Sequence, residues 1–328
     1  MSQVGRRQFL LAAAAMLAAP RKGAGQPQSE RVRIAIFEDG NEGATEALWR
    51  EFRGRLRELG RVEGENVSFV SRFSQGKRNR LPELAAELVA LAPDVIVVAT
   101  TPASRAAMRA TSSIPIVFVT GDPLGGGLVS NLARPGGNAT GQSILSVELS
   151  TKWVEILAEL VPGTKKIAML GQASNRSLVA VVRSLQLAAG KRGISARLLE
   201  ATQPQEIDSA FETMAREGFD AFITASALTV LRHRRQIVNL AARYRLPAVY
   251  SRNEYVAAGG LLSYTPDRVA VYRSMADQVQ RVLDGANPGD LPVQQPTKFD
   301  LIVNLKTAKA LGLAIPQSIL LRADRVIE

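Results

Sequence analysis

The chain of 328 residues contains no cysteine and a single histidine, His233. The absence of cysteine excludes a disulfide scaffold, a Cys-ligated zinc or iron–sulfur site, a thiol nucleophile and a lipidated cysteine. One histidine argues against His-based metal sites and Ser–His–Asp triads, because each needs His and partners brought together. We therefore expect no metal and no cofactor. With 46% hydrophobic and 22% charged residues, the chain is predicted to be globular with a real core.

Acidic residues are fewer than basic ones, with 30 Asp and Glu against 41 Lys and Arg and a formal charge of +11. The basic excess is scattered, as in Arg50, Arg53 and Arg57, which fall on the predicted solvent face of a helix. Nucleic-acid binding normally needs a basic stripe together with a recognisable motif, and no such motif follows. The charge pattern favours a solvated surface and no nucleic-acid partner.

The sequence also offers no long apolar run near its start. The uncharged stretch after Arg6 and Arg7 ends near Ala19 and is about half the length that a bilayer requires. Paired arginines, a short apolar run and small residues at its end are the parts of an export signal, and the pair resembles the twin-arginine signal of bacteria. We expect residues 1–25 to be a cleaved export signal and the mature protein to be periplasmic.

After residue 30, short apolar strands alternate with amphipathic helices in two series of similar length. The first series has strands at Val32–Ile36, Asn66–Arg72, Asp94–Ala99 and Ile114–Val119, and the second at Lys166–Leu170, Ser195–Leu199, Ala221–Thr224 and Ala248–Tyr250. Continuous apolar strands between helices indicate parallel sheets covered on both faces. The pattern predicts an α/β fold of two doubly wound, Rossmann-like lobes joined by a hinge.

The boundaries between the lobes follow from what interrupts this alternation. Gly121–Gly141 is rich in glycine and proline and is predicted to be a long functional loop. A helix at Asp267–Leu283 and a strand at Phe299–Val303 follow the second series, so we expect the chain to cross back between lobes. The predicted N-terminal lobe comprises residues 30–142 and about 265–290, and the C-terminal lobe residues 143–264 and about 291–328.

Enzyme motifs fail on inspection. Gly125–Gly127 lacks dinucleotide-binding spacing, and the Gly-Lys pairs at Gly76 and Gly190 lack the Ser or Thr that a P-loop needs after lysine. Gly141-Gln142-Ser143 is followed by Leu145 where a nucleophile elbow needs glycine. We therefore expect a binding protein that performs no covalent step.

Polar residues stand where the predicted strands end. In open α/β sheets, ligands bind beyond the carboxyl ends of the strands, so two facing lobes predict a cleft that closes by hinge motion. Thr101 is a candidate N-cap before Pro102, a place that suits a carboxylate or phosphate. Glu38 and Asp39, just past the first strand, could receive an ammonium. Simple capping and solvated loop acids are the alternative interpretations. The candidate ligand-binding residues are Glu38, Thr100, Thr101, Thr120, Asp122, Ser174, Asn175, Ser226, Tyr250 and Tyr264.

Several longer motifs are shared with a known family. They are Gly121-Asp122-Pro123, the run Leu-Ala-Arg-Pro-Gly-Gly-Asn-Ala-Thr-Gly at 132–141, Gly-Gly-Leu-Leu-Ser-Tyr at 259–264, and the tail from Leu291 to Glu328. On these motifs, nearly all of residues 30–328 resembles the bacterial ABC transporter substrate-binding proteins of the tryptophan/tyrosine type. The resemblance implies a type I periplasmic-binding fold, with Asp122, Tyr264 and the helix start at Thr101 lining or shaping the cleft.

The resemblance implies a receptor that binds a small polar solute, such as an amino acid or another carboxylate, and delivers it to an ABC permease and its ATPase. Contact with the membrane would then run only through the permease. An exported sensor that presents the solute to a signalling receptor is the alternative, and a two-lobe glycosyltransferase-like enzyme is a further one. A transcriptional regulator is disfavoured, because residues 1–30 hold no helix-turn-helix.

Overall fold

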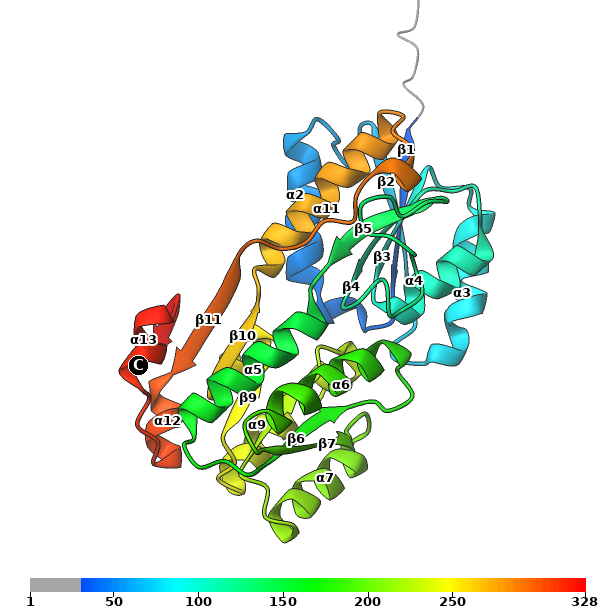
Figure 1. The fold of residues 1–328 in the computed structure, drawn as a ribbon. Coiled ribbons are helices and arrows are strands. Elements are labelled where there is room, and N and C mark those ends of the chain that lie inside the picture. Colours follow the sequence, from blue (N-terminus) through cyan, green and yellow to red (C-terminus); the bar gives the residue numbers. More distant parts are fainter. Residues whose placement is uncertain (1–30) are drawn as a thin grey trace, which may run out of the picture.

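The computed structural model describes residues 31–328, and its elements form two lobes, each built around one sheet (Figure 1). In the N-terminal lobe, five parallel strands stand in the order β2-β1-β3-β4-β5. Their bounds are β1 Val32–Glu38, β2 Val67–Phe73, β3 Val95–Ala99, β4 Ile116–Thr120 and β5 Ala139–Ser143. The export signal predicted for residues 1–25 lies outside the described residues.

Helices cover both faces of this first sheet. On one face, α2 (Glu46–Glu58) and α11 (Arg268–Leu283) lie side by side and bury Trp49, Phe52 and Tyr272. On the other face, α3 (Leu81–Ala90) and α4 (Thr101–Ala110) pack through leucine and alanine. Short 3-10 turns occur at η1 (Glu42–Ala44), η2 (Arg78–Arg80) and η3 (Pro288–Asp290).

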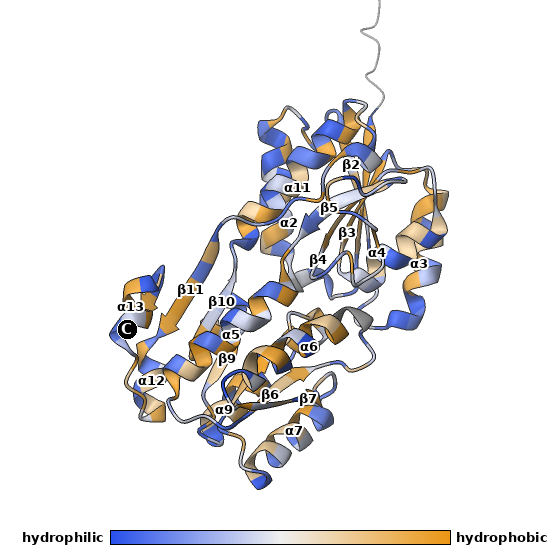
Figure 2. Ribbon diagram, viewed as in Figure 1, coloured by the Kyte–Doolittle hydropathy of each residue, from blue (hydrophilic) through white to orange (hydrophobic). Residues whose placement is uncertain are grey.

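The C-terminal lobe holds seven strands in the order β12-β11-β10-β9-β8-β6-β7, all parallel except the antiparallel pair β10 and β11. Their bounds are β6 Lys166–Gly171, β7 Ser195–Glu200, β8 Ala221–Thr224, β9 Ala248–Tyr250, β10 Leu262–Pro266, β11 Phe299–Asn304 and β12 Arg325–Ile327. Figure 2 shows apolar residues concentrated in strands such as β3 and β11.

The helices of this lobe also divide between the two faces of its sheet. One face is packed by α5 (Ser146–Leu160), α6 (Arg176–Gly190), α12 (Leu305–Leu311) and α13 (Gln317–Arg322). The other is packed by α7 (Pro204–Arg216), α8 (Leu228–Leu231), α9 (Arg234–Arg243) and α10 (Asn253–Ala257). The predicted α/β fold of two doubly wound lobes is confirmed.

The two sheets repeat one strand order. In chain order, β6 to β10 stand as β7-β6-β8-β9-β10, which matches β2-β1-β3-β4-β5. In such a sheet the order reverses between the first and third strands, and ligands bind at the carboxyl ends of those two strands. The expected binding positions are therefore the ends of β1 and β3 in one lobe and of β6 and β8 in the other.

Three segments carry the chain between the sheets. The first is Ile144-Leu145, between β5 and α5, and Leu145 has a left-handed backbone with φ 54°. The second is Asp267, between β10 and α11. The third follows Gln294, whose backbone bonds to Gly141 and Ser143 at the edge of the first sheet before the chain reaches β11. A joint of three short segments permits hinge motion of one lobe against the other.

Two details differ from the sequence-based expectation. The strand β5 begins within the last residues of the predicted loop. The sequence pattern did not predict it, because Ala-Thr-Gly-Gln-Ser has little apolar character. A Cβ at Gly141 would lie 2.0 Å from the Phe118 carbonyl oxygen, so glycine allows this strand to approach β4. The amphipathic pattern of Thr229–Arg243 predicts one helix, whereas the structure has two, α8 and α9, which are separated at Arg232-His233.

Candidate functional site

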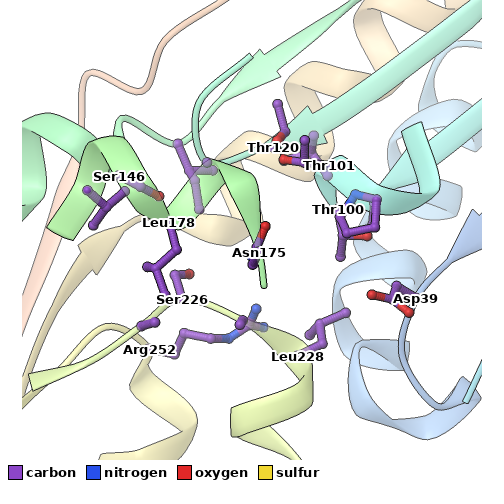
Figure 3. Close-up of a pocket in the computed structure, with 18 of the residues that line it drawn as sticks. Asp39, Thr100, Thr101, Thr120, Ser146, Asn175, Leu178, Ser226, Leu228 and Arg252 are labelled. Carbon is purple, nitrogen blue, oxygen red and sulfur yellow. Dashed lines mark hydrogen bonds between the residues drawn. The ribbon is translucent and has the colours of Figure 1, made fainter. Parts of the chain in front are cut away.

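A cavity lies between the lobes, at the carboxyl ends of the strands where the topology places a ligand. Its volume is about 80 Å³, against the roughly 10–15 Å³ that one water needs. The N-terminal lobe contributes the ends of β1, β3 and β4, and the C-terminal lobe contributes the segments after β6, β8 and β9. Figure 3 shows Thr100, Thr101 and Thr120 on one side and Ser226, Leu228 and Arg252 on the other.

Six of the ten residues predicted from the sequence line this cavity: Glu38, Thr100, Thr101, Thr120, Asn175 and Ser226. Glu38 ends β1, while Thr100 and Thr101 follow β3. Asn175 comes after β6, and Ser226 comes after β8. The structure therefore brings together residues that the sequence placed only at separate strand ends.

Glu38 is the buried acid of the site. Its side chain is fully buried, and Oε2 accepts hydrogen bonds from Thr45 Oγ1 at 2.7 Å and Trp49 Nε1 at 2.8 Å. The other oxygen, Oε1, is buried without a hydrogen-bond partner. Burial raises the pKa of Glu38, and the two hydrogen bonds and the charges of Arg252 and Arg268 oppose that rise. The free oxygen suits a hydrogen-bond donor, above all a cationic one.

Asp39, the next residue, is already paired. It accepts hydrogen bonds from Ser74 Oγ at 2.8 Å and from Arg78 Nε at 2.8 Å. The Asp39 side chain is 2% exposed and that of Arg78 is 25% exposed. Both residues line the cavity, and their pairing leaves Glu38 as the described lining acid with a free oxygen.

The start of α4 differs from the prediction that Thr101 is the N-cap. The helix begins at Thr101, so Thr100 occupies the cap position, and neither hydroxyl caps the helix. Thr100 has φ 86° and ψ 145°, a conformation that costs a non-glycine residue about 1–3 kcal/mol and clusters at functional sites. Its hydroxyl is buried without a partner, whereas the Thr101 hydroxyl bonds to that of Thr120. The Thr100 hydroxyl is therefore available to a ligand in the cavity.

Unpartnered polar atoms gather in this cavity. Among the described residues, eleven buried side-chain nitrogen or oxygen atoms lack a hydrogen-bond partner, and six of these belong to residues lining the cavity. They are Glu38 Oε1, Thr100 Oγ1, Ser226 Oγ, Arg268 Nε and Nη1, and Tyr272 Oη. The Tyr272 hydroxyl lies beside the Arg268 guanidinium without a hydrogen bond of good geometry. Buried polar groups are normally bonded, so these six atoms are available to bond to a molecule held in the cavity.

Comparison with known proteins accounts for this architecture. The family model described as ABC transporter substrate binding protein matches residues 38–327. The chain belongs to this family. A curated relative, the tyrosine-binding protein of Clostridioides difficile (strain R20291), is 26% identical over 260 residues, which are 79% of this chain and 74% of the relative.

Two solved structures resemble this substrate-binding protein over most of its length. A conserved domain protein from Vibrio cholerae is 30% identical with a TM-score of 0.85, and the match covers 90% of this chain and 99% of that one. An ABC domain from Streptococcus pneumoniae in complex with L-Trp is 26% identical with a TM-score of 0.84, covering 90% of this chain and 100% of that one. The expected type I periplasmic-binding fold is confirmed.

Four residues predicted for the site lie outside the cavity in this substrate-binding protein. Asp122 accepts a hydrogen bond from the Gly125 backbone N–H at 2.8 Å in an exposed turn. Ser174 lines an adjoining pocket, which shares Arg78, Thr101 and Asn175 with the cavity. Their contact with a ligand stays a prediction.

Both tyrosines of that set have packing roles. Tyr250 is 1% exposed, and its ring stacks on Tyr255 with centroids 4.8 Å apart. Tyr264 lies within β10, stacks on Phe299 and accepts a hydrogen bond from Trp153 Nε1 at its carbonyl. A tyrosine at a strand end fits either a cavity wall or a core position, and sequence alone does not separate the two.

Residues that the prediction missed also line the cavity. Arg252, which follows β9, and the apolar Leu178 and Leu228 come from the C-terminal lobe, while Arg268 and Tyr272 come from α11 of the N-terminal lobe. The position of Arg252, two residues after Tyr250, was a signal available in the sequence. No sequence pattern near Arg268 predicts a site residue there, because Arg268 lines the cavity only as a result of α11 packing back on the first sheet.

The lobes touch each other around the cavity, so the structure represents a closed arrangement. A Cβ at Gly40, after β1, would lie 2.9 Å from Leu228 Cδ1 of the other lobe. A Cβ at Gly76 would lie 2.7 Å from Arg232 Nη1, also across the lobes. Within residues 31–328, no group of three or more His, Cys, Asp or Glu could hold a metal. No helix in that part of the chain is long and apolar enough to span a membrane.

Proposed function

We propose that this substrate-binding protein is a periplasmic receptor that binds an amino acid with an apolar or aromatic side chain and delivers it to an ABC permease. The observation that carries the proposal is the enclosure of unpartnered polar groups of both charge signs in one cavity. An acidic oxygen of Glu38, the guanidinium of Arg268 and free hydroxyls of Thr100 and Ser226 all line it. An amino acid presents an ammonium and a carboxylate on one carbon and suits such a set.

The polar groups suggest an orientation for the ligand. The ammonium donates to Glu38 Oε1, and the carboxylate accepts from the free Thr100 hydroxyl at the start of α4, where helix N–H groups also favour an anion. Leu178, Val181 and Leu228 of the C-terminal lobe supply an apolar wall. That wall suits an apolar or aromatic side chain, in keeping with the named ligands of the relatives from Clostridioides difficile and Streptococcus pneumoniae.

Transport then depends on a shift between open and closed lobes. The open form admits the ligand, and the closed form is favoured because the ligand supplies bonds to both lobes at once. A permease recognises the closed form, and its ATPase drives the transport. The receptor itself makes and breaks no covalent bond, and residues 1–25 act as the export signal that places it outside the cytoplasm.

The test is calorimetry with protein from which bound ligand has been removed by mild denaturation and refolding. L-tryptophan, L-tyrosine, L-phenylalanine, L-leucine and glycine are compared, and mass spectrometry identifies any ligand that co-purifies with the untreated protein. We expect the large apolar side chains to bind with dissociation constants far below that of glycine. A co-purified sugar, together with no heat from any amino acid, would refute the proposal.

Two rival functions make different predictions. An exported sensor would bind the same ligand, but cells lacking this protein would retain uptake of the radiolabelled amino acid, whereas a transport receptor is needed for that uptake. A two-lobe glycosyltransferase-like enzyme would consume a nucleotide-sugar. We expect no turnover of nucleotide-sugars and a rise in melting temperature with the amino acid.

A further inference from the structure

Among the described residues that line the cavity, Arg268 is the cation that forms no ion pair with a carboxylate. Arg268 is the first residue of α11, immediately after the crossing at Asp267. Its Nε and Nη1 atoms are buried and have no hydrogen-bond partner. The neighbouring Asp267 is engaged elsewhere, because it accepts from the Ala270 backbone N–H and from Lys298 Nζ. An enclosed guanidinium in this condition normally requires an anion.

A second guanidinium approaches from the opposite lobe. Arg252 follows β9, is 2% exposed, and reaches into the cavity near Ser226 and Leu228 (Figure 3). Its Nη2 atom donates to Glu254 Oε1 at 2.6 Å, so Glu254 balances its charge. The Asp39 carboxylate balances Arg78 in the same way. After these pairings, Arg268 is the lining cation left without an ion pair in the described part of the chain.

The two arginines lie on different lobes, so the distance between their positive charges depends on whether the cleft is open or closed. Arg252 belongs to the C-terminal lobe and Arg268 to the N-terminal lobe, so closing the cleft brings two positive groups together. Burial and repulsion by the charge of Arg252 lower the pKa of Arg268, whereas Tyr272 and the charge of Glu254 oppose that fall. An anion between the guanidinium groups replaces this repulsion with two charge-assisted contacts.

We infer that Arg252 and Arg268 form an interlobe clamp for an acidic group of the ligand, and that this acidic group is what stabilises the closed form. The inference rests on the proposed function in that the acidic group is then the carboxylate of the amino acid. Thr100 supplies a hydroxyl to the same group, while the arginines supply the charge. A ligand that keeps its side chain and ammonium but lacks the acid is expected to bind weakly and to leave the lobes open.

The test compares three ligands of one shape on the wild-type protein: L-tyrosine, tyramine, which lacks the carboxylate, and 3-(4-hydroxyphenyl)propionate, which lacks the ammonium. L-tryptophan, tryptamine and indole-3-propionate repeat the comparison for an indole. Calorimetry gives affinity, and small-angle X-ray scattering gives the radius of gyration, which falls on closure. We expect the acid-bearing ligands to compact the protein and the amines to leave it extended.

The variant Arg268→Gln sharpens this comparison. Loss of one partner from a buried charge pair predicts a fall of roughly 100-fold in the affinity for L-tyrosine. The affinity for tyramine should change by less than about threefold, because tyramine makes no contact with the clamp. Arg268→Lys should recover part of the loss. Arg273→Gln, on the same helix but paired with Glu58 at the surface, is the matched control and should bind like the wild type.

The outcomes separate the clamp from the proposed function. If L-tyrosine or L-tryptophan binds but its amine binds and compacts the protein equally well, the clamp is wrong and the proposed function stands. If the deaminated acids bind and no amino acid does, the clamp stands and the proposed function fails. If none of the six ligands binds, and L-phenylalanine and L-leucine do not bind either, both fail. The wild-type comparison decides between these outcomes even if Arg268→Gln does not fold.

Discussion

The N-terminal and C-terminal lobes present the same strand ends to the cavity but fill them with different chemistry. The N-terminal lobe contributes Glu38, Thr100, Arg268 and Tyr272, each of which has a buried polar atom without a partner. Of the described residues, the C-terminal lobe contributes one such atom to the cavity, on Ser226, beside an apolar wall that includes Leu178 and Leu228. A shared strand order therefore fixes where a residue lies at the site but leaves its chemistry open.

From this difference we expect the two lobes to contribute at different stages of binding. In the open form, the free polar groups of the N-terminal lobe are hydrated, and a zwitterion can replace that water before the cleft closes. The apolar wall of the C-terminal lobe gains only when closure removes it from water. We therefore expect the first contact to be polar and to involve the N-terminal lobe, and closure to add apolar burial and the contact with Arg252.

The largest expected effect compares one residue from each lobe. Glu38→Ala leaves the ligand ammonium buried without a partner, which costs about 3–5 kcal/mol and corresponds to a loss of roughly 100- to 4,000-fold in affinity. Ser226→Ala removes one neutral hydrogen bond, worth about 0.5–1.5 kcal/mol, and should weaken binding by no more than about tenfold. Calorimetry with the amino acid that binds best measures both.

Glu38→Gln is the control that keeps the size and shape of the Glu38 side chain and removes its charge. Glu38→Gln should bind more weakly than the wild type, because an amide carries no charge to match the ammonium. Thermal denaturation confirms that each variant is folded. Equal losses for Glu38→Ala and Ser226→Ala would contradict the division between a polar and an apolar lobe.

The next effect tests the contact between the lobes instead of the contact with ligand. Gly40→Val introduces a Cβ that would lie 2.9 Å from Leu228 Cδ1, so the closed form is overpacked by about 1–3 kcal/mol. Affinity should fall by roughly tenfold, and the ligand-induced drop in radius of gyration should shrink. Gly43→Val is the matched control, since a Cβ there meets nothing within 4 Å. A Gly40 variant that binds and closes like the Gly43 variant would show that closure does not involve this contact.

A smaller effect concerns pH. Burial raises the pKa of Glu38 above its ordinary value of 4.5, and a bound ammonium lowers it again, so binding favours the ionised carboxylate. Affinity should therefore be full well above the pKa of the free protein's Glu38 and should fall as pH drops through that pKa. Calorimetry from neutral pH down toward pH 4.5 measures the change, and Glu38→Gln should remove it. A wild type whose affinity rises on acidification would reverse the sign and refute the assignment of the ammonium.

Most of the fold could be predicted from the sequence, because a run of consecutive apolar residues indicates each buried strand without knowledge of its tertiary contacts. Val95–Ala99 and Ile116–Thr120 are continuous apolar runs, and their ends located Thr100 and Thr120 at the site. The strand β5 was missed because its burial comes from neighbours, as when Thr140 donates to the Leu291 carbonyl, and such contacts leave no local pattern.

The site was predictable only where its residues follow their own strand. Arg268 reaches the cavity because α11 packs on α2, a contact between segments more than two hundred residues apart in the chain. Tyr250 has a strand-end position like that of Thr120, but it faces a core of aromatic rings that includes Phe222 and Tyr255. The direction of a side chain at a strand end depends on tertiary packing, and the spacing of residues does not report it.

The smallest expected effect concerns Asp122, a residue that the family resemblance placed at the cleft. Its carboxylate accepts from the Gly125 backbone N–H at 2.8 Å and shapes an exposed turn, next to Gly121, which lines the cavity. Asp122→Ala should lower the free energy of unfolding by about 1 kcal/mol, the worth of one hydrogen bond, and change affinity by less than about twofold. Asp122→Asn keeps an acceptor for the turn and should restore the stability. A loss of affinity in both variants, with stability retained in Asp122→Asn, would mean that the charge of Asp122 meets the ligand, and the polar contribution of the N-terminal lobe would then extend into this turn.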